Sequence, residues 1–427
     1  MMLVAEQRIR EVCPAASVHI LTSAPELLRH FFPNAIPVSA ESRRAWLDAR
    51  AILGRCRRRL PDWLFRRLRS LEDTLWTAVP RFCSFAVGLK QRVKGQTRSA
   101  PSRFIAEIRS SELVLVTGMG CFNDAFSDSA LAILDVLAIA MRYGIPVALL
   151  GQGVGPIEDP ELLHRAGEVL PRVSFIGLRE GKTALPLLAS LGVSPSRVEV
   201  TGDDALELAY SGRSGTLGRG IGVNIRVATY SQVSQELIPR IRTVLERVAA
   251  AVGAPLVPIP VSSHPGESDG GTLMQMAAEA PGLWKGNFQL EHPSRLVEQA
   301  GLCRVVVAGS YHAAVFALAQ GIPAVCIEGS PYYSQKFGGL QAQFGPGCEV
   351  VSMAEPDFDR RLEGTIRLSW DSAEGLREPL LQAAAVQIEQ GRAAYSRLFE
   401  NVGASGDKLK SLNASRPKRP HTISRVS

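Results

Sequence analysis

The sequence predicts an α/β protein made of two doubly wound halves. Short apolar stretches of strand length alternate with longer helical patterns in two successive series. A Gly/Ser-rich stretch, residues 211–220, separates the two series and has the composition of a linker. The length of 427 residues also favours two domains over one. We therefore expect an N-terminal domain over 1–215, a C-terminal domain over 216–402 and a disordered basic tail over 403–427.

The first series begins with a helix over 4–12 and a strand over 18–21, and the alternation resumes after residue 103. In doubly wound sheets, ligands bind beyond the carboxyl ends of the strands, so the loops that follow strands are the informative ones. The expected elements are strands over 113–117, 146–150, 174–177 and 198–200, and helices over 131–141, 160–169, 180–191 and 205–210.

The second series has the same alternation. Its expected strands are 221–224, 255–259, 304–308 and 323–327, and its expected helices are 232–252, 294–300 and 311–320. Irregular loops are expected around His264, Asp269 and Lys336. A long amphipathic helix over 372–402 follows, and by analogy with this layout it crosses back to the first half.

The net charge of +7 is unevenly distributed along the chain. Residues 41–103 hold 16 Lys and Arg against 5 Asp and Glu, and residues 405–427 hold 6 against 1, which leaves −9 for the rest. In 41–103 the Arg runs are mixed with Trp and Leu, which is typical of amphipathic helices with basic faces. The segment is either a solvated hairpin that covers the first domain or a peripheral contact with the inner face of an anionic membrane.

Several protein classes are excluded by patterns that the sequence lacks. The seven Cys are scattered, without a C-x-x-C pair or a zinc spacing, so reduced thiols and a cytoplasmic location are expected. Charged residues interrupt the N-terminus before a signal-peptide core, and the most apolar stretch, 130–150, contains Asp135 and Arg142. There is no Walker loop, metalloprotease motif or nucleic-acid-binding module. We expect neither a metal nor a nucleic acid as a ligand.

A glycine-rich loop, Gly-Gln-Gly-Val-Gly-Pro over 151–156, follows a strongly apolar strand. Its glycines allow backbone N–H groups to turn toward an anion, and the following helix offers its positive end. The loop is not the dinucleotide fingerprint, because Pro156 stands in the wrong place. A tight structural turn and a ligand-contacting loop both explain these residues.

His312 is the candidate catalytic residue. It lies in the first turn of a helix that follows a strand of valines, and Ser310 is a good N-cap for that helix. The helix dipole disfavours imidazolium there, so a neutral His with its N–H directed at a ligand suits acid–base work or phosphate contact. The alternative is a His that only packs against the next loop.

Arg179 follows a strand and opens a helix, where its guanidinium can bind phosphate or carboxylate. The alternative is an exposed Arg paired with Glu180 or Asp203. Asp203 and Asp204 also follow a strand, and capping of the next helix is the favoured role for them because no metal-ligand set is present.

These loops, taken in order, resemble the polysaccharide pyruvyl transferase family over about residues 110–345. The resemblance rests on the order and spacing of five motifs rather than on any one of them. They are the loop over 151–156, Gly177-Leu-Arg179-Glu, Val200-Thr-Gly-Asp203-Asp-Ala-Leu, the strand–loop–helix at His312 followed by Gly321-Ile-Pro, and Lys336-Phe-Gly-Gly-Leu.

The resemblance implies a GT-B-like fold of two Rossmann-like domains and the transfer of a pyruvyl group from phosphoenolpyruvate to a sugar of a cell-surface or exopolysaccharide precursor, free or lipid-linked. It implies His312 as the general acid and Arg179 as a clamp for the donor's anionic groups, and it implies no metal or redox cofactor. The candidate substrate-binding residues are Arg179, Gly151, Gln152, Gly153, Ser310, Tyr311, Lys336, His264, Asn224 and Arg226.

The sequence departs from the family pattern at two places. The family commonly has Arg-x-His at the second site, and Ser310 stands at that Arg position, so Lys336, Arg226 or another residue must supply the second cation. Family members usually begin with a strand and a Gly-Asn-x-Gly-Asp loop, whereas this sequence begins inside the expected first helix. The first strand is therefore expected to be encoded upstream of Met1 or to be missing.

Two other functions fit the same residues. A nucleotide-sugar-dependent glycosyltransferase would use the same scaffold. The presence of Ser310 in place of the family's usual Arg is compatible with that function. A non-catalytic protein that binds a membrane surface through 41–103 is the third hypothesis.

Overall fold

The computed structural model describes residues 1–44, 46–47, a scatter of residues from 61 to 85, 101–118, 120–228, 230–233, 235–263, 268–289 and 292–414. The chain divides into two compact units. The larger unit comprises Met1–Arg8, Leu115–Leu137 and Leu149–Arg392, and the smaller unit comprises Ile9–Val114, Ala138–Ala148 and Ala393–Ser427. Residues on both sides of position 215 belong to the larger unit, so the domain boundary expected there stays a prediction.

A five-stranded parallel sheet lies in the larger unit. Its strands are β7 (Gly220–Asn224), β8 (Leu256–Pro258), β9 (Cys303–Ala308), β10 (Ala324–Glu328) and β11 (Cys348–Ser352), in the spatial order β11-β10-β9-β7-β8. Each neighbouring pair is parallel. The strands are rich in Val and almost fully buried, as expected for a parallel sheet that is covered on both faces.

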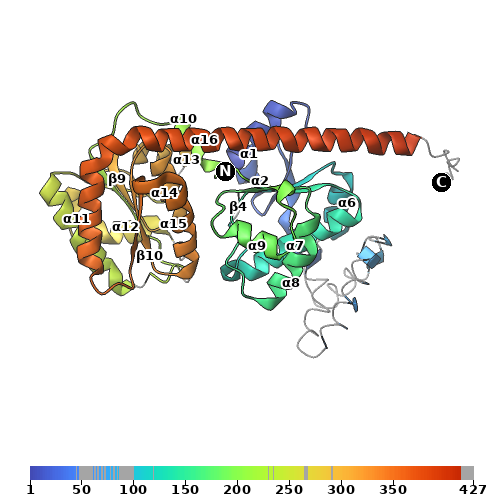
Figure 1. Ribbon diagram of the computed structural model, residues 1–427, viewed down its shortest axis with the longest axis horizontal. Helices are drawn as coiled ribbons and strands as arrows, with labels where there is room; N and C mark the ends of the chain where they lie inside the picture. The colour runs from blue at the N-terminus through green and yellow to red at the C-terminus, as the bar shows by residue number, and fades with distance from the viewer. Residues whose placement is uncertain are drawn as a thin grey trace. The chain divides into compact units, whose positions relative to one another are not determined.

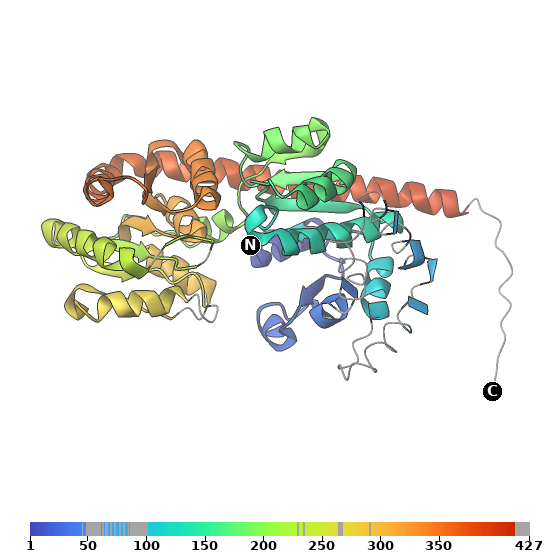
Figure 2. The same cartoon turned by 90° about the horizontal axis from the view of Figure 1, so that it is seen from below.

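Alternate residues of these strands pack against different helices. On one face, Val305 and Val307 pack with α11 (Ile238–Val252), α12 (Asp269–Ala277) and the start of α16 (Phe358–Ala414). On the other face, Val306 and Ala308 pack with α13 (Pro293–Ala300), α14 (Tyr311–Leu318) and α15 (Pro331–Phe344). Figures 1 and 2 show these helices on both sides of the sheet. The doubly wound arrangement predicted for the second series is confirmed.

A four-stranded sheet has the order β3-β4-β5-β6, which follows the chain. Its strands are β3 (Val114–Thr117), β4 (Val147–Gln152), β5 (Phe175–Leu178) and β6 (Val198–Val200). After these strands come, in turn, α7 (Ser127–Arg142), α8 (Pro160–Val169), α9 (Ala184–Ser190) and α10 (Ala205–Ser211). β5 and β6 pair in parallel, with Ile176 opposite Val198. This regular alternation confirms the α/β prediction for the first series.

The smaller unit contains a parallel pair of short strands, β1 (His19–Thr22) and β2 (Ile36–Ser39), joined by α2 (Pro25–Phe31). The chain enters this pair from α1 (Met2–Val12). In the same unit the ring of Trp46, which is fully buried, lies 5.6 Å from that of Phe104 on α6 (Pro101–Ser110). Most of the basic segment 41–103 lies outside the described residues, so both interpretations of it stay predictions.

Helix α16 is much longer than the helix predicted over 372–402. It runs from Phe358 to Ala414, so residues 403–414 are helical and not part of a disordered tail. The sequence placed the end of the helix near 403 because Gly403, Ser405, Gly406 and Asp407 have low helix propensities. The rest of the predicted tail, 415–427, lies outside the described residues.

Four other predicted elements are corrected by the structure. The helix expected from 180 begins at Ala184, because Gly181 and the turn at 182–183 precede it. The helix expected from 232 begins at Ile238 after a short 3-10 turn, and Pro239 occupies its second position. Asp269 is not in a loop but begins α12, with Ser268 as its N-cap. Lys336 is not in a loop either, since α15 extends from Pro331 to Phe344.

The described part of the chain contains no helix that is long and apolar enough to cross a membrane.

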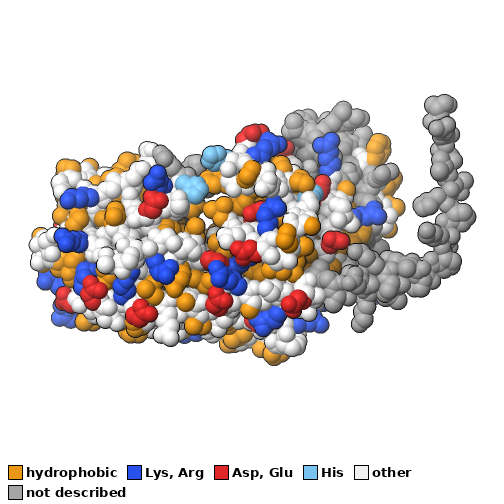
Figure 3. Space-filling model, turned by 90° about the horizontal axis from the view of Figure 1, so that it is seen from above, with side chains coloured by type: hydrophobic (Ala, Val, Ile, Leu, Met, Phe, Trp, Pro, Cys, Tyr) orange, Lys and Arg blue, Asp and Glu red, His pale blue; other side chains and the backbone are white. Residues whose placement is uncertain are grey.

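The described cysteines are free, in agreement with the expected reduced thiols; they are Cys13, Cys83, Cys121, Cys303, Cys326 and Cys348. On the face drawn in Figure 3, Lys and Arg side chains are interspersed with Asp and Glu side chains. The described surface on that face is thus mixed in charge, in contrast to the basic segment 41–103.

Candidate functional site

Three loops that follow strands of the larger unit bring polar side chains together. Asp203 follows β6, Arg179 follows β5, and His312 lies at the start of α14, after β9. One carboxylate oxygen of Asp203, Oδ2, lies 3.8 Å from Nη1 of Arg179 and 3.9 Å from Nε2 of His312. The strand-end placement that the sequence predicted is therefore observed for these three residues.

Asp203 is held in this position by the start of α10. Its Oδ1 accepts a hydrogen bond of 2.8 Å from the backbone N–H of Ala205, while Oδ2 is buried and has no hydrogen-bond partner in the described part of the chain. The capping role predicted for the pair thus belongs to Asp203. Asp204 occupies the N-cap position but makes no cap hydrogen bond, and it binds Arg8 and Thr117 instead.

Arg179 is buried, contrary to the exposed Arg of the alternative reading. Its guanidinium carbon lies 4.1 Å from the centre of the Tyr311 ring, and its Nε has no hydrogen-bond partner among the described residues. Two glycines leave space for the guanidinium. A Cβ atom added at Gly120 or Gly153 would lie 2.6 or 2.7 Å from Nη2 of Arg179. Gly120 was not singled out in the sequence, because only the fold brings it to Arg179.

The glycine-rich loop contributes to the site differently from the prediction. β4 continues through Gly151 and Gln152, and the buried Gln152 side chain donates hydrogen bonds to the backbone oxygens of Val116 and Leu150. The next helix, α8, begins only at Pro160. Its first N–H groups are satisfied by its N-cap Asp159, so its positive end is already occupied by a carboxylate. The contribution of Gly153 to the site is therefore that its lack of a side chain leaves space for the guanidinium of Arg179.

His312 is the second residue of α14, as predicted. Its side chain is 27% exposed, and its buried Nε2 has no hydrogen-bond partner within the described residues. The pKa of His312 is lowered to about 4, mainly by desolvation and to a smaller extent by the charges of Arg179 and Lys336, whereas Asp203 opposes this shift. The imidazole is therefore neutral near pH 7, in the form expected from the sequence, although burial rather than the helix dipole is the main cause.

Within the described part of the chain, two neighbouring hydroxyl groups are buried without a hydrogen-bond partner. Ser310 is the N-cap residue of α14, but its hydroxyl makes no cap hydrogen bond, which corrects the capping prediction. Neither Ser310 Oγ nor the Tyr311 hydroxyl has a hydrogen-bond partner among the residues that the structure describes. Burial raises the pKa of Tyr311, so its hydroxyl keeps its proton. Unsatisfied buried groups are costly, so both hydroxyls are suited to a ligand.

Lys336 brings a second cation to the site from α15. Its ammonium lies 3.7 Å from the centre of the Tyr332 ring and 5.9 Å from that of Tyr311, and it donates a hydrogen bond to the Tyr332 hydroxyl. Burial and the charge of Arg179 lower the pKa of Lys336 well below its usual range. The ammonium form of Lys336 is therefore disfavoured in the free site, and an anionic ligand next to Arg179 and Lys336 would stabilise it.

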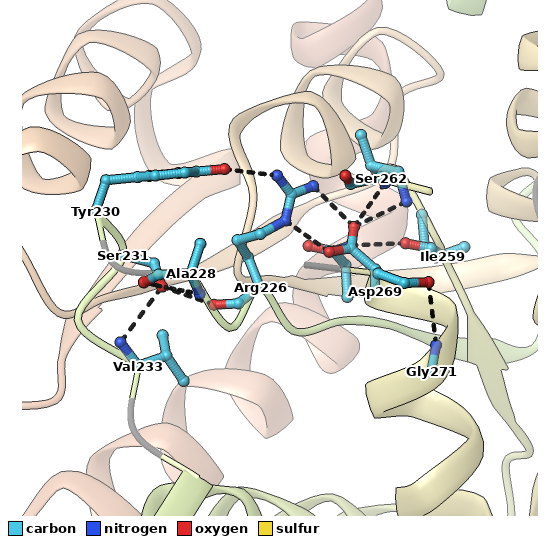
Figure 4. Close-up of polar contacts among 12 residues, drawn as sticks. Arg226, Ala228, Tyr230, Ser231, Val233, Ile259, Ser262, Asp269 and Gly271 are labelled. Carbon is cyan, nitrogen blue, oxygen red and sulfur yellow. Dashed lines mark hydrogen bonds and ion pairs between the residues drawn. The ribbon is translucent and has the colours of Figure 1, made fainter. Parts of the chain in front are cut away.

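Arg226 and Asn224 belong to a separate network (Figure 4). Arg226 forms two hydrogen bonds with Asp269, of 2.6 Å to Oδ1 and 2.9 Å to Oδ2, and a third of 3.0 Å to the Tyr230 hydroxyl. Asn224 donates to Asp269 and to the backbone oxygen of Ile259. Burial disfavours the charged form of Arg226, but the hydrogen bonds to Asp269 and the charge of that carboxylate outweigh burial and raise the pKa of Arg226.

Arg226 is thus fully paired, and Lys336 fits the role of second cation better. His264 lies outside the described residues.

Two further residues of the site were not assigned to it from the sequence. Cys121 is a buried thiol whose pKa is raised by burial to about 11, against the lowering effect of Lys336 and Arg179. Glu180 is buried, and burial raises its pKa. It packs against α15, where a Cβ atom added at Gly339 would lie 2.8 Å from its Cγ. Cys121 belongs to no local motif, so only the fold reveals it, whereas Glu180 stands in the Gly177-Leu-Arg179-Glu motif and was considered only as a partner of Arg179.

The arrangement can bind an anion and move a proton. Arg179 and Lys336 supply positive charge, the hydroxyls of Ser310 and Tyr311 supply hydrogen bonds, and His312 with Asp203 supplies an acid–base pair. The described residues contain no group of three or more His, Cys, Asp or Glu side chains that would hold a metal ion.

Known proteins give two kinds of similarity. A family model described as polysaccharide pyruvyl transferase matches residues 1–331. None of the curated protein sequences compared matches the chain.

Solved structures share the fold. A protein described as a UDP-N-acetylglucosamine 2-epimerase from Listeria monocytogenes has a TM-score of 0.56 and 11% sequence identity, over 99% of this chain and 95% of that one. The glycotransferase of kitacinnamycin has a TM-score of 0.53 and 13% identity, over 93% and 94% of the two chains. These similarities establish a GT-B-like, Rossmann-like α/β fold.

Proposed function

We propose that this chain, which belongs to the polysaccharide pyruvyl transferase family, is a transferase that moves a pyruvyl group from phosphoenolpyruvate to a saccharide acceptor. The observation that carries the proposal is the cluster of Arg179, Lys336, His312 and Asp203 in the larger unit. It joins two cations to a neutral imidazole next to a carboxylate. A donor with a phosphate and a carboxylate requires the first feature, and protonation of its vinyl carbon requires the second.

Arg179 and Lys336 are the proposed donor-binding cations. The guanidinium of Arg179 offers a planar pair of donors, and its Nε is buried without a partner in the described chain. Lys336 supplies the second charge in place of the Arg that Ser310 replaces in the family pattern. The Ser310 hydroxyl, which is buried and unpartnered among described residues, supplies a further hydrogen bond to the donor.

His312 is the proposed proton donor. A proton from its imidazolium is added to the vinyl CH2 carbon, which becomes a methyl group and leaves positive charge on the neighbouring carbon. One sugar hydroxyl oxygen bonds to that carbon, the carbon–oxygen bond to phosphate breaks, and a second sugar hydroxyl bonds in its place. The products are a cyclic ketal and inorganic phosphate. Of the two hydroxyl protons, one restores His312 and the other leaves with phosphate or water.

The low pKa of His312 is consistent with this role once the donor is bound. In the free site, burial and the charges of Arg179 and Lys336 keep the imidazole neutral. An anionic donor would offset both cations and place negative charge near the ring, and each effect raises the pKa of the imidazole. Proton donation is thereby coupled to donor binding, because only the occupied site favours the imidazolium form.

The proposed acceptor is a sugar of a cell-surface or exopolysaccharide precursor. The basic segment 41–103 would bring the enzyme to a lipid-linked precursor at the inner face of the membrane, since Lys and Arg are attracted to anionic lipids. Flotation with liposomes that contain anionic lipid, compared with neutral liposomes, tests this part. Equal flotation with both lipids would contradict it.

Phosphate release tests the transfer reaction. The full chain is incubated with phosphoenolpyruvate and lipid-linked or nucleotide-linked sugars, and inorganic phosphate is measured. We expect acceptor-dependent release that His312→Ala abolishes. The matched control is His164→Ala, because His164 is a half-exposed residue on the surface of α8. If the chain binds a nucleoside diphosphate in calorimetry and shows no response to phosphoenolpyruvate, the chain is a nucleotide-sugar glycosyltransferase instead.

A further inference from the structure

Three aromatic side chains of the larger unit form a cluster next to the cationic site. The ring of Phe126 lies 5.3 Å from that of Tyr230 and 5.7 Å from that of Tyr332, and the rings of Tyr230 and Tyr332 are 5.8 Å apart. We call Phe126, Tyr230 and Tyr332 the aromatic cluster. Its members come from three different segments, which are the turn before α7, the loop after β7 and the first turn of α15.

The aromatic cluster is half-exposed, but it rests on a buried base. Phe126, Tyr230 and Tyr332 each keep part of their surface accessible, whereas Tyr333 beneath them is buried. Tyr333 stacks on Tyr230 at 6.3 Å, and on the buried Phe337 at 5.2 Å. A rigid aromatic surface of this kind loses little conformational entropy when a ligand covers it.

Tyr230 is held at both ends. Its hydroxyl accepts the 3.0 Å hydrogen bond from Arg226, which is itself fixed by Asp269, as Figure 4 shows. Its backbone oxygen accepts a hydrogen bond of 2.9 Å from the hydroxyl of Ser330. The Arg226–Asp269 pair therefore acts as a positioning device for the Tyr230 ring.

The aromatic cluster adjoins the site through Tyr332. The ammonium of Lys336 lies 3.7 Å from the centre of the Tyr332 ring and is also hydrogen-bonded to its hydroxyl. A molecule that lies on Phe126 and Tyr230 is consequently a neighbour of the cation to which we assign donor binding. The contact between Lys336 and Tyr332 thus places the aromatic cluster, an apolar surface with polar groups at its edge, next to the residues proposed to bind the donor.

We propose that the aromatic cluster binds the acceptor saccharide by stacking against one face of a sugar ring. A pyranose has a face of C–H groups that packs on aromatic carbon, and hydroxyls at its edge that need hydrogen-bond partners. The cluster supplies the aromatic carbon, and the tyrosine hydroxyls supply polar partners at its edge. The inference rests on the proposed transfer reaction for the identity of the acceptor, but the binding surface can be tested without that reaction.

Saturation-transfer NMR of methyl hexosides with the full chain tests the surface directly. We expect transfer to the sugar ring protons in the wild type and in Phe126→Trp, which keeps an aromatic face. We expect a loss of about five- to tenfold in Phe126→Leu, which keeps apolar volume only. Phe31→Leu is the matched control, because Phe31 is a half-exposed phenylalanine of the smaller unit. Unchanged transfer in Phe126→Leu, or none in the wild type, would overturn the inference.

Kinetics separate this inference from the proposed function. If both hold, Phe126→Leu raises the acceptor KM about five- to tenfold and leaves the phosphoenolpyruvate KM unchanged. If the wild type neither binds nor consumes phosphoenolpyruvate, and Phe126→Leu still loses sugar saturation, the transfer reaction is wrong and the saccharide surface stands. If phosphate release is normal and the acceptor KM of Phe126→Leu equals that of the wild type, the surface is wrong and the transfer reaction stands.

Discussion

Oδ2 of Asp203 lies 3.9 Å from Nε2 of His312, and the other oxygen of the same carboxylate is fixed by the backbone N–H of Ala205. The carboxylate is therefore held in place by the start of α10, independently of the imidazole. Desolvation and two cations lower the pKa of His312, and Asp203 opposes them. The proton affinity of the imidazole thus depends on a residue for which the sequence favoured the role of a helix cap.

Replacement of Asp203 by Asn should make His312 harder to protonate. The change removes the negative charge that favours imidazolium, so the pKa of His312 falls below about 4, by roughly one further unit. At a pH above that pKa, the protonated fraction and the rate of phosphate release would both fall about tenfold. The pH–rate profile of Asp203→Asn checks this, with the exposed Asp359→Asn as control. An unchanged rate would show that Asp203 does not act on His312.

Binding of a donor-like anion should have the opposite effect on the same residue. Inorganic phosphate near Arg179 and Lys336 would offset their charge, so the pKa of His312 should rise toward its ordinary value. A titration of the His312 ring proton by NMR, without and with phosphate, measures the shift. The half-exposed His164 provides an internal reference in the same spectrum. A phosphate-dependent shift that also occurs in Arg179→Gln with Lys336→Gln would assign the effect to another site.

The stability of the protein should depend on His312 below neutral pH. Its folded-state pKa of about 4 is lower than the ordinary value of 6.5, so the unfolded chain binds more protons between these values. Stability contributed by the neutral imidazole is therefore complete above about pH 6.5 and falls as the pH falls toward 4. The upper bound is about 3 kcal/mol. Urea unfolding at pH 7 and pH 5 should show a smaller loss for His312→Gln than for the wild type; equal losses would contradict the shift.

Gly153→Ala should weaken donor binding more than it weakens the fold. The new Cβ atom would lie 2.7 Å from Nη2 of Arg179, and the flexible end of that side chain can move away at little cost in stability. The guanidinium would then leave its position over Tyr311, and we expect the phosphoenolpyruvate KM to rise about tenfold. Gly375→Ala is the control, because no atom of the described residues lies within 4 Å of a Cβ added at that helical glycine, and the change should stabilise α16 slightly. A normal KM with a large loss of stability would assign Gly153 a structural role only.

The sequence predicted the fold well because the fold depends on local patterns. Valine-rich runs such as β9 mark strands directly, and the glycine-rich stretch over 211–220 marks a break between α10 and β7. Both series of strands and helices were found in the expected order. The errors occurred where tertiary packing decides. Lys336 was expected in a loop, because the Gly-Gly pair after it obscured the helical pattern of α15.

The sequence predicted that the site residues follow the ends of strands, but it did not predict which side chains contact one another. The positions of Arg179 and Asp203 after β5 and β6 follow from the alternation, so their proximity was expected. The role of Gly120, the aromatic cluster, and the pairing of Arg226 with Asp269 depend on segments distant in sequence, for which a single sequence offers no spacing signal. From the sequence, Arg226 was therefore interpreted as a cation available to a ligand, whereas in the structure it pairs with the carboxylate of Asp269.

Breaking the Arg226–Asp269 pair should destabilise the larger unit strongly. Asp269 is fully buried and accepts hydrogen bonds from Arg226, from Asn224 and from the backbone N–H groups of Val261 and Ser262. Arg226→Met would leave that carboxylate without its cation, at a cost of about 3–5 kcal/mol. The exposed pair Arg240–Asp359 offers a control, and Arg240→Met should cost less than about 1 kcal/mol. Chemical unfolding of both variants compares the two costs. Similar small losses would show that the pair does not support the fold, and would leave Tyr230 without the positioning device inferred for it.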